Sequence, residues 1–473
     1  MGPISKFRRW LSGYGTVRRD EFGYDAAAST PRRQGPPAAL RREDDELPAA
    51  DRKRLVSGTR NIQRNFTLAG WMIRKHLDYV STFDFQARTG IPALDDELEA
   101  FVKWWSRPAN CDVTGRFSLA RMIRMAEERR TLDGDVFALK LDDGRVQWIE
   151  GDRVLNPGLI PQGHTAKDFV HGVLIDPVGR PLAYAVHRRN GSSFEFERMV
   201  PAEWIVPHAF IDRFDQVRGI SPMAAAINTL RDVYEGCDYA LAKMKVAQLF
   251  ALAFYREADD AAGEITPTMD ENGLPKESGY KVDLGKGPLK LDLEPGDRAE
   301  FLESKSPSLE FQAQNSIAIQ MAFAGLDIPQ CFYDQSITNF SGQRQAILQY
   351  EHSSDIKRQD TRATLDALLR WRLGMEIVDR RLTLPRGISL DDPLWEWVSK
   401  GVPWIDPLKE INASLAAVGG GLTSRQRDCK GRGENWFEIV DELAQENEYL
   451  AEKNVQTSIA FAPVPAEVVN ANN

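Results

Sequence analysis

The sequence lacks the features that mark membrane-spanning, secreted and zinc-binding proteins. Its longest strongly apolar stretch, Val246–Tyr255, has ten residues and includes Gln248, whereas a membrane-spanning helix needs about 20. No apolar segment follows the first basic residues, so we expect no secretory signal peptide. Only four cysteines occur in 473 residues, and no two form a Cys-x-x-Cys pair. This usage favours a reducing compartment and argues against a zinc site.

Recognisable enzyme motifs are also scarce. None of the six histidines stands at metal-ligand spacing from another, and no phosphate-binding loop or dinucleotide-binding glycine pattern occurs. Gly219-Ile220-Ser221-Pro222 comes nearest to a nucleophile elbow but lacks the second glycine. We therefore expect a protein that is not an enzyme and that needs no cofactor and no metal.

What the chain has is an ordinary globular composition with an acidic balance. Hydrophobic residues make up 42% and charged residues 27%, and 60 Lys+Arg face 69 Asp+Glu, for a net charge of −9. These fractions exclude a wholly disordered or collagen-like chain. The length predicts two to four domains with a large core.

The first 60 residues differ from the rest. They contain 13 Lys/Arg and 8 Asp/Glu, and four prolines interrupt a stretch without apolar periodicity. We expect a flexible basic N-terminal arm over residues 1–54, because such a segment buries too little surface to offset its ordering entropy. The arm is either a solubilising tail or a contact for nucleic acid or a neighbouring subunit.

Two hydrophobic periods follow one another along the first half of the chain. Spacings of three and four predict helices over Leu55–Asp78, Leu94–Trp105 and Ser118–Arg130. The period then changes to two around the turn Asp142-Asp143-Gly144, which predicts a hairpin. Similar strand patterns recur up to residue 210. The predicted fold class is therefore α+β.

The sharpest helix signal covers Gly219–Tyr255, with Ser221 as the cap and Pro222 in the first turn. One apolar stripe recurs there at alternating spacings of three and four: Met223, Ile227, Leu230, Tyr234, Cys237, Leu241 and Met244. Such a narrow stripe lets a long helix lie against a neighbouring helix. It is either part of the internal core or a seam between identical subunits.

The second half alternates between polar connections and helices. Residues 257–305 are polar, strand-like and punctuated by glycine and proline. A helix is expected from about Ser306 to Leu326, with an apolar side formed by Leu309, Ala313, Ile317, Met321 and Ala324. After the polar loop Asp334–Ser341, a very long helix is expected over Gly342–Val378, and a final acidic helix over Glu434–Glu452.

Several short segments, in this order and spacing over about residues 55–450, together resemble the lambda-type family of tailed-bacteriophage portal proteins. They are Asp133-Gly134-Asp135-Val136-Phe137, the run 148–154, Arg218-Gly219-Ile220-Ser221-Pro222, Gly325-Leu326-Asp327-Ile328-Pro329, the run 338–344, the run 404–410 and the run 420–424. Gly342 departs from the family pattern, which has a small hydroxyl residue there, and we expect it to loosen the start of the long helix.

The resemblance implies the portal fold, assembled as a ring-shaped homo-oligomer of about twelve copies at the unique capsid vertex. Double-stranded DNA would be packaged and ejected through this head–tail connector. The implied partners are further copies of the chain, DNA in transit, the terminase large subunit, a capsid or scaffold protein and a head–tail adaptor. The implied location is the virion, after assembly in the cytoplasm of the host bacterium, without a membrane.

The resemblance also divides the chain into expected segments. These are the arm 1–54, a mixed wing 55–218, stem helix 219–256, a small β-containing clip 257–305, stem helix 306–329, a tunnel loop 330–341, a long wing helix 342–378, a helical crown 379–457 and a frayed tail 458–473.

Three groups of residues are the expected functional sites. The tunnel loop would offer DNA the polar side chains of Gln335, Ser336, Thr338 and Asn339, with Arg344 as the charged contact one turn further on. Without the resemblance, this loop reads as an ordinary helix connection with Ser341 as the N-cap. The clip would meet its partners through Lys281, Lys286 and Lys290, and subunits would meet along the stripe of the first stem helix.

The acidic charge agrees with a conduit for DNA. A protein that grips DNA is basic, because its affinity comes from neutralising phosphates. A ring of twelve copies would carry −108 formal charges, which favours sliding over holding. Two alternatives stay open: a metal-dependent nuclease with a site built from Asp142, Asp143, Asp391 and Asp392, and another structural virion component such as a scaffold or tail protein.

Overall fold

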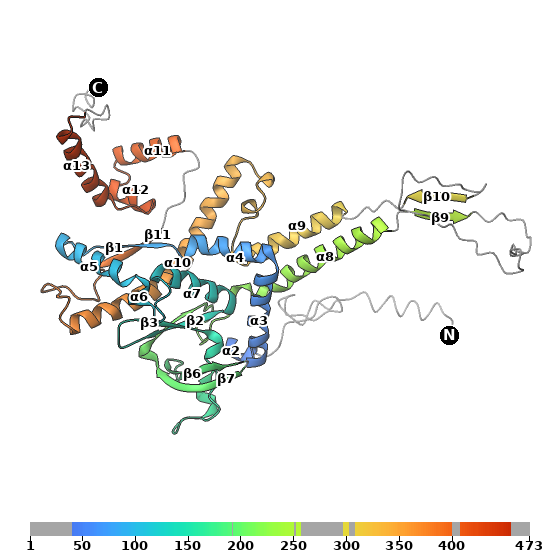
Figure 1. The fold of residues 1–473 in the computed structure, drawn as a ribbon, viewed down its shortest axis with the longest axis horizontal. Coiled ribbons are helices and arrows are strands. Elements are labelled where there is room, and N and C mark those ends of the chain that lie inside the picture. Colours follow the sequence, from blue (N-terminus) through green and yellow to red (C-terminus); the bar gives the residue numbers. More distant parts are fainter. Residues whose placement is uncertain are drawn as a thin grey trace, which may run out of the picture. The chain divides into compact units, whose positions relative to one another are not determined.

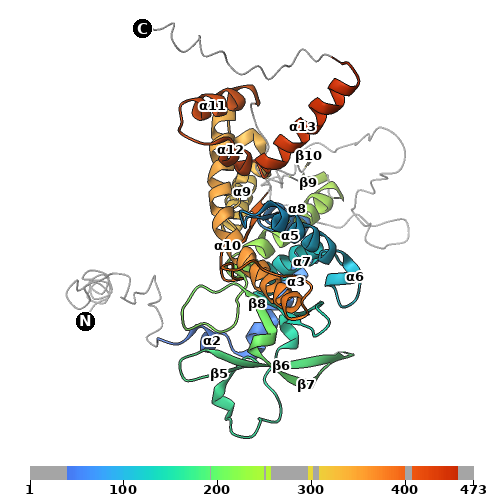
Figure 2. The same cartoon turned by 90° about the vertical axis from the view of Figure 1, so that its left-hand side faces the viewer.

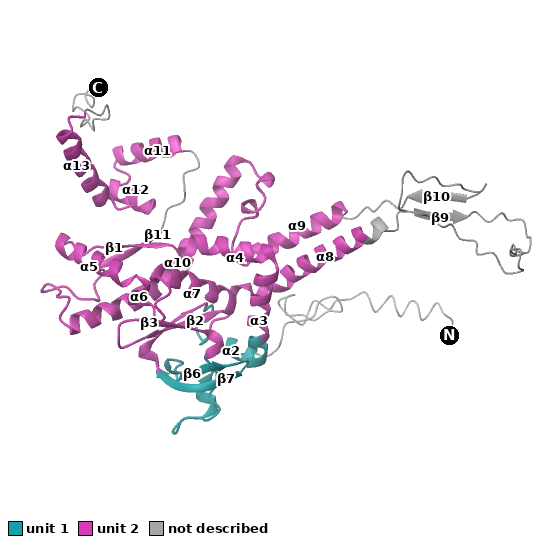
Figure 3. Cartoon of the chain, in the orientation of Figure 1, with its two compact units in different colours: residues 1–53, 154–200, 211–218 teal, residues 54–153, 201–210, 219–473 magenta. Residues whose placement is uncertain are grey.

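The computed structural model describes residues 40–191, 193–249, 252–256, 297–301, 308–399 and 407–455. The chain divides into two compact units, coloured separately in Figure 3. Unit 1 holds residues 1–53, 154–200 and 211–218, and unit 2 holds residues 54–153, 201–210 and 219–473. Within the described residues, no helix is both long and apolar enough to cross a membrane.

Unit 1 is built on a four-stranded sheet in the order β4-β5-β6-β7, of which Figure 2 labels β5, β6 and β7. The strands are β4 (Phe169–Val170), β5 (Val173–Ile175), β6 (Pro181–Asn190) and β7 (Ser193–Pro201). A small core of Phe169, Leu174 and Ala185 lies on one face of this sheet. The predicted strand pattern in this region is confirmed.

The predicted N-terminal arm is too long. Residues 43–46 form the short helix α2 (Glu43–Glu46), and α3 (Ala49–Asn65) begins before residue 54. Asp44 is buried, and its carboxylate accepts hydrogen bonds from the backbone N–H groups of Val217 at 2.8 Å and Arg218 at 3.2 Å. This pairing anchors residues 43–46 to the rest of unit 1. Residues 1–39 of the predicted arm lie outside the described residues.

The first half of unit 2 combines helices with a small antiparallel sheet. The predicted helix over Leu55–Asp78 is in fact two, because Phe66 has an extended backbone that ends α3 and precedes α4 (Thr67–Val80). The helices α5 (Pro92–Trp105), α6 (Pro108–Cys111) and α7 (Leu119–Asp133) follow.

The sheet of this half has β2 in its centre. Its order is β3-β2-β8, formed by β2 (Asp135–Lys140), β3 (Val146–Glu150) and β8 (Ile205–Ala209). The hairpin predicted around Asp142-Asp143-Gly144 is confirmed: β2 and β3 pair antiparallel, and Gly144 has a φ of 81°. Positive φ is the conformation that glycine adopts at least cost.

Two helices of unit 2 lie side by side and lead to a pair of strands (Figure 1). The 3-10 turn η5 (Pro222–Ala225) precedes α8 (Ile227–Leu249), and the second helix is α9 (Leu309–Ala324). The helix predicted to reach Tyr255 ends at Leu249. Residues 252–256 instead form β9 (Leu252–Arg256), which pairs antiparallel with β10 (Asp297–Phe301), as suits a segment containing Phe254 and Tyr255.

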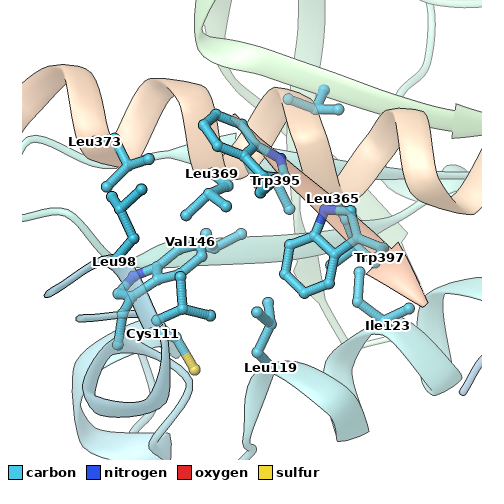
Figure 4. Packing of buried hydrophobic residues seen from close by; sticks show 14 of the residues in the cluster. Leu98, Cys111, Leu119, Ile123, Val146, Leu365, Leu369, Leu373, Trp395 and Trp397 are labelled. Atoms are coloured by element: carbon cyan, nitrogen blue, oxygen red, sulfur yellow. The ribbon is translucent and has the colours of Figure 1, made fainter. Parts of the chain in front are cut away.

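The longest helix is α10 (Phe340–Val378), and its second half lies in the main core. Figure 4 shows Leu365, Leu369 and Leu373 of α10 packed with Trp395 and Trp397. Both indole N–H groups donate to the same Asp366 oxygen, at 2.8 and 3.0 Å.

The predicted boundary of the crown is therefore wrong. Trp395 and Trp397 belong to β11 (Trp395–Ser399), which pairs antiparallel with β1 (Phe83–Ala87). Residues 379–399 thus share a core with the first half of unit 2, because they carry the apolar side chains that cover α10. Beyond them follow α11 (Pro407–Gly419), α12 (Arg425–Gly431) and α13 (Trp436–Glu452).

A buried carboxylate joins four elements of unit 2. Glu127 of α7 is 1% exposed; its oxygens lie 2.7 Å from Nε2 of His208 on β8, 3.4 Å from Nε2 of His76 on α4 and 3.1 Å from Arg130. The hydroxyl of Thr361 on α10 lies 3.4 Å away. Burial opposes the charge, but Arg130 and the two imidazoles outweigh it and hold the pKa of Glu127 well below its usual range.

Burial has the opposite consequence for His76. Its imidazole is fully enclosed, and desolvation lowers its pKa below the ordinary 6.5, so the ring stays neutral in the folded chain. The unfolded chain therefore takes up this proton at a higher pH than the folded chain does. The neutral His76 ring therefore costs the folded chain no stability above about pH 6.5. Below that pH the free energy of unfolding decreases, by at most about 1.4 kcal/mol per pH unit for one proton.

We expect the variant His76→Gln, which keeps an N–H donor for Glu127, to lose this part of the acid sensitivity. Melting temperatures measured between about pH 7.5 and about pH 5.5 should fall less in the variant than in the wild type. Glu127 contributes stability above its unfolded pKa and loses it only at still lower pH, so it does not mask the comparison. Equal falls in both proteins would contradict the assignment to His76.

Candidate functional site

The start of α8 is fixed by two glycines at a close backbone crossing. A Cβ on Gly219 would collide with the carbonyl oxygen of Gly134, and a Cβ on Gly134, whose φ is 96°, would meet Gly219 in return. The N–H of Gly219 donates to Asp135 at 3.0 Å. Ser221 caps the following turn as predicted: its oxygen accepts from Met223 N–H at 3.1 Å, and its hydroxyl donates to the carbonyl of Thr131 at 2.7 Å.

The apolar stripe of α8 has an internal half. Met223, Ile227 and Leu230 are at most 7% exposed, and they pack in one core with Phe323 of α9 and with Leu326, two residues beyond the end of α9. For these three residues the prediction of a seam between subunits is wrong, because α4 and α9 of the same chain already cover them.

The other half of the stripe is only partly covered by the chain itself. Tyr234 and Leu241 are 38% and 47% exposed, Cys237 is exposed, and Met244 is half-buried. The ring of Tyr234 lies 5.3 Å from that of Phe66, so only its outer side is open. This half remains available as a contact for another molecule.

The predicted apolar side of α9 is exposed in the structure. Leu309, Ile317 and Met321 are 82%, 51% and 65% exposed, and Ala313 and Ala324 are exposed as well. We call these five residues the α9 stripe. Because they recur at spacings of four and three, they share one helix face.

The α9 stripe does not face α8. That contact is made by Phe311, whose ring lies near Gly236, and by Asn315, whose amide reaches Cys237 Sγ at 3.7 Å. The sequence pattern revealed the stripe, but not that the remaining side of α9 would be the one to pack on α8.

The connection between α9 and α10 is held at its beginning by an ion pair that the sequence analysis missed. Asp327 has a φ of 59°, and its carboxylate lies 2.8 Å from both Lys357 Nζ and Ser353 Oγ of α10. These bonds outweigh partial burial and lower the pKa of Asp327. The sequence offered only the run Asp327-Ile328-Pro329, in which aspartate is one of the few residue types that adopt the left-handed conformation.

The polar loop that follows is composed of short turns. η6 (Gln330–Phe332) and η7 (Gln335–Ile337) carry it to the start of α10. Asp334 accepts from the N–H and the hydroxyl of Ser336, at 2.9 and 2.6 Å. Gln335, Ser336 and Asn339 are exposed, while Thr338 is half-buried.

The cap of α10 differs from the expected one. Asn339, not Ser341, is the N-cap, and its side chain accepts from Gly342 N–H at 2.8 Å. Gly342 lies in the first turn, where a Cβ would collide with the Thr338 hydroxyl. The missing side chain thus makes room for the loop to pack on the helix. Arg344, the expected charged contact, lies 3.4 Å from Glu410 of α11.

Two further groups of predicted residues are the clip lysines and the aspartates of the alternative nuclease site. Lys281, Lys286 and Lys290 lie outside the described residues. Asp143 accepts from its neighbour Arg145, and Asp392 accepts from Ser389 N–H, so both serve their own turns. In the described ranges, no group of three or more His, Cys, Asp or Glu side chains could hold a metal ion.

Comparisons with known proteins agree with the resemblance. A probable portal protein of Halomonas phage phiHAP-1 is 26% identical over 351 residues, which cover 68% of this chain and 65% of the relative's length. The chain thus spans less than two thirds of that relative in the match.

Two solved structures match most of this chain at low sequence identity. One is from the neck of an empty gene transfer agent (GTA) particle computed with C6 symmetry, with a TM-score of 0.50 at 14% identity, covering 82% of this chain and 94% of the other. The other is from the virion of a native GTA particle, with a TM-score of 0.49 at 14% identity and coverages of 80% and 93%.

The family profile described as "Phage portal protein, lambda family" matches residues 30–358. This range contains the glycine crossing, both halves of the α8 stripe, the α9 stripe and the loop before α10. Since the match covers more than half of the sequence, the chain belongs to the lambda family of phage portal proteins.

Proposed function

We propose that this chain is the subunit of a portal ring at one vertex of a phage-like capsid, through which double-stranded DNA is packaged and later ejected. The observation that carries the proposal is the family match across residues 30–358. The relative's name, probable portal protein, supports it, as does the fold similarity to the GTA neck. In this role the chain is a structural component of the virion, and the expected partners are a terminase, a capsid or scaffold protein and a head–tail adaptor.

The paired helices α8 and α9 supply the surfaces for ring formation. The open half of the α8 stripe, Tyr234 to Met244, and the α9 stripe are two different apolar faces on one pair of helices. A contact between two different faces of identical subunits closes into a ring when the rotation allows it. A helix face that stays in water is usually polar, whereas both of these faces carry several exposed apolar side chains. We therefore assign the two faces to contacts with the neighbouring copies.

The loop before α10 supplies the contact with DNA. Gln335, Ser336 and Asn339 present neutral polar groups, and no Lys or Arg lies between Asp334 and Ser341. Strong phosphate binding relies on cations. A loop of this kind therefore makes short-lived hydrogen bonds, and the pairing of Arg344 with Glu410 reduces the free positive charge nearby.

Imaging of the purified protein tests ring formation directly. Negative-stain micrographs should show closed rings with a central hole. A protein that stays a single subunit under every condition tried, or one that cleaves DNA with a divalent metal through Asp391 and Asp392, would overturn the proposed function.

The variants Leu241→Asp and Ile317→Asp should block ring formation without unfolding the chain. Burying a leucine or isoleucine side chain stabilises a contact by about 1.5–3 kcal/mol, and each ring repeats the contact at every interface. Light scattering should report single subunits with unchanged circular dichroism. The matched control is Leu159→Asp, at a leucine 90% exposed in unit 1. Rings of normal size in both stem variants would remove these faces from the interface.

The double variant Gln335→Glu and Asn339→Asp should impair packaging but not assembly. Aspartate keeps the N-cap of α10, while two added negative charges per copy repel the phosphates of passing DNA. The measurement is DNA content per particle in a phage supplied with the variant. Gln349→Glu, at an exposed position of α10, is the control for added charge. Normal DNA content in the double variant would exclude the loop from the mechanism.

A further inference from the structure

A cavity of about 550 Å³ lies between α10, β11 and α12 of unit 2. Its volume falls within the range of about 300–1,000 Å³ that is typical of small-ligand sites. Trp397, Val398 and Leu348 supply apolar wall, and charged side chains from all three elements supply the remainder. None of the roles proposed above uses this cavity.

The three carboxylates in the lining are each compensated. Glu351 lies 2.5 Å from Arg358, Asp355 lies 3.1 Å from Arg362, and Glu396 lies 2.5 Å from Lys430. Two of these cations also donate to backbone carbonyl groups: Arg358 to that of Tyr79 at 2.6 Å, and Arg362 to that of Trp397 at 3.2 Å. These pairs form walls that are charged but close to neutral as a whole.

Two basic side chains are left over. Arg427 of α12 and His352 of α10 line the cavity and are exposed, and no ion pair of either is found among the described residues. The backbone N–H of Arg427 donates to Ser424 Oγ at 3.2 Å as part of the cap of α12, and in the described part of the chain its guanidinium makes no hydrogen bond. The cavity is therefore locally positive in a chain whose net charge is −9.

We propose that this cavity binds a small oxyanion, a carboxylate or a phosphate, with the Arg427 guanidinium as its principal ligand. A guanidinium presents paired N–H donors that match the two oxygens of such an anion. The compensated pairs hold the neighbouring carboxylates at fixed places, so an incoming anion meets the excess charge of Arg427, with the His352 imidazole beside it. The apolar side chains beside them accommodate the carbon skeleton of an organic acid. All the lining residues belong to one copy, so the proposal does not depend on ring formation.

The test is calorimetric titration of the full-length protein with citrate and, separately, with inorganic phosphate. Arg427→Gln should weaken binding by at least about tenfold, which corresponds to about 1.4 kcal/mol. Arg425→Gln removes the same charge from an exposed position of the same helix that does not line the cavity. This control should bind like the wild type.

Two results would overturn the proposal: no heat of binding with either anion at millimolar concentration, and an equal loss in the Arg425 and Arg427 variants. If neither anion binds but a short DNA duplex does, and Arg427→Gln weakens that binding, the cavity belongs to a nucleic-acid surface. Preference for citrate over phosphate, or the reverse, would identify which oxyanion the site takes.

Discussion

A single buried carboxylate connects four elements of unit 2, among them the long helix α10. Glu127 is reached from α4, α7, β8 and α10, and its negative charge is tolerable only because Arg130 and two imidazoles converge on it. Removing one partner of such a buried pair costs far more than the pair contributes in net stability. The four elements are therefore held in one mutual arrangement, and α10 extends from this arrangement toward the loop that we assign to DNA.

The helix α8 shows how one periodic stripe serves two purposes. Its first three members are buried against α9 and α4, which sets the direction of the helix within its own chain. Its later members, from Tyr234 onward, remain open. One residue pattern along α8 thus fixes the helix within its own chain and leaves the face that we propose as a contact with the next subunit.

Much of this could be read from the sequence, because hydrophobic period and turn chemistry are local properties. The hairpin at Gly144, the Ser221 cap and the paired long helices follow from residues that are neighbours in the chain. The resemblance to portal proteins rested on the same local segments and is confirmed by the family match.

What could not be predicted depends on contacts between distant residues. Nothing near Trp395 indicates that its strand pairs with β1, some three hundred residues earlier, so the sequence alone places residues 379–399 with the crown. The sequence also contains no sign that the buried Asp44 carboxylate accepts a hydrogen bond from the distant Val217 N–H. Exposure of the α9 stripe also escaped prediction, since a periodic pattern shows which residues share a face but not whether the chain itself covers that face.

The distribution of burial along α10 has a mechanical consequence. Its first ten residues have no buried side chain, and burial begins at Tyr350. At 1.5 Å per residue, this beginning of the helix without a buried side chain is about 15 Å long. A helical segment of that length is stiff. The position of the turns that precede it therefore depends on how the buried part of α10 is held. If several copies surround an opening with these turns, the width of the opening would be set by the buried part of α10. The sequence of the turns could then change without changing that width.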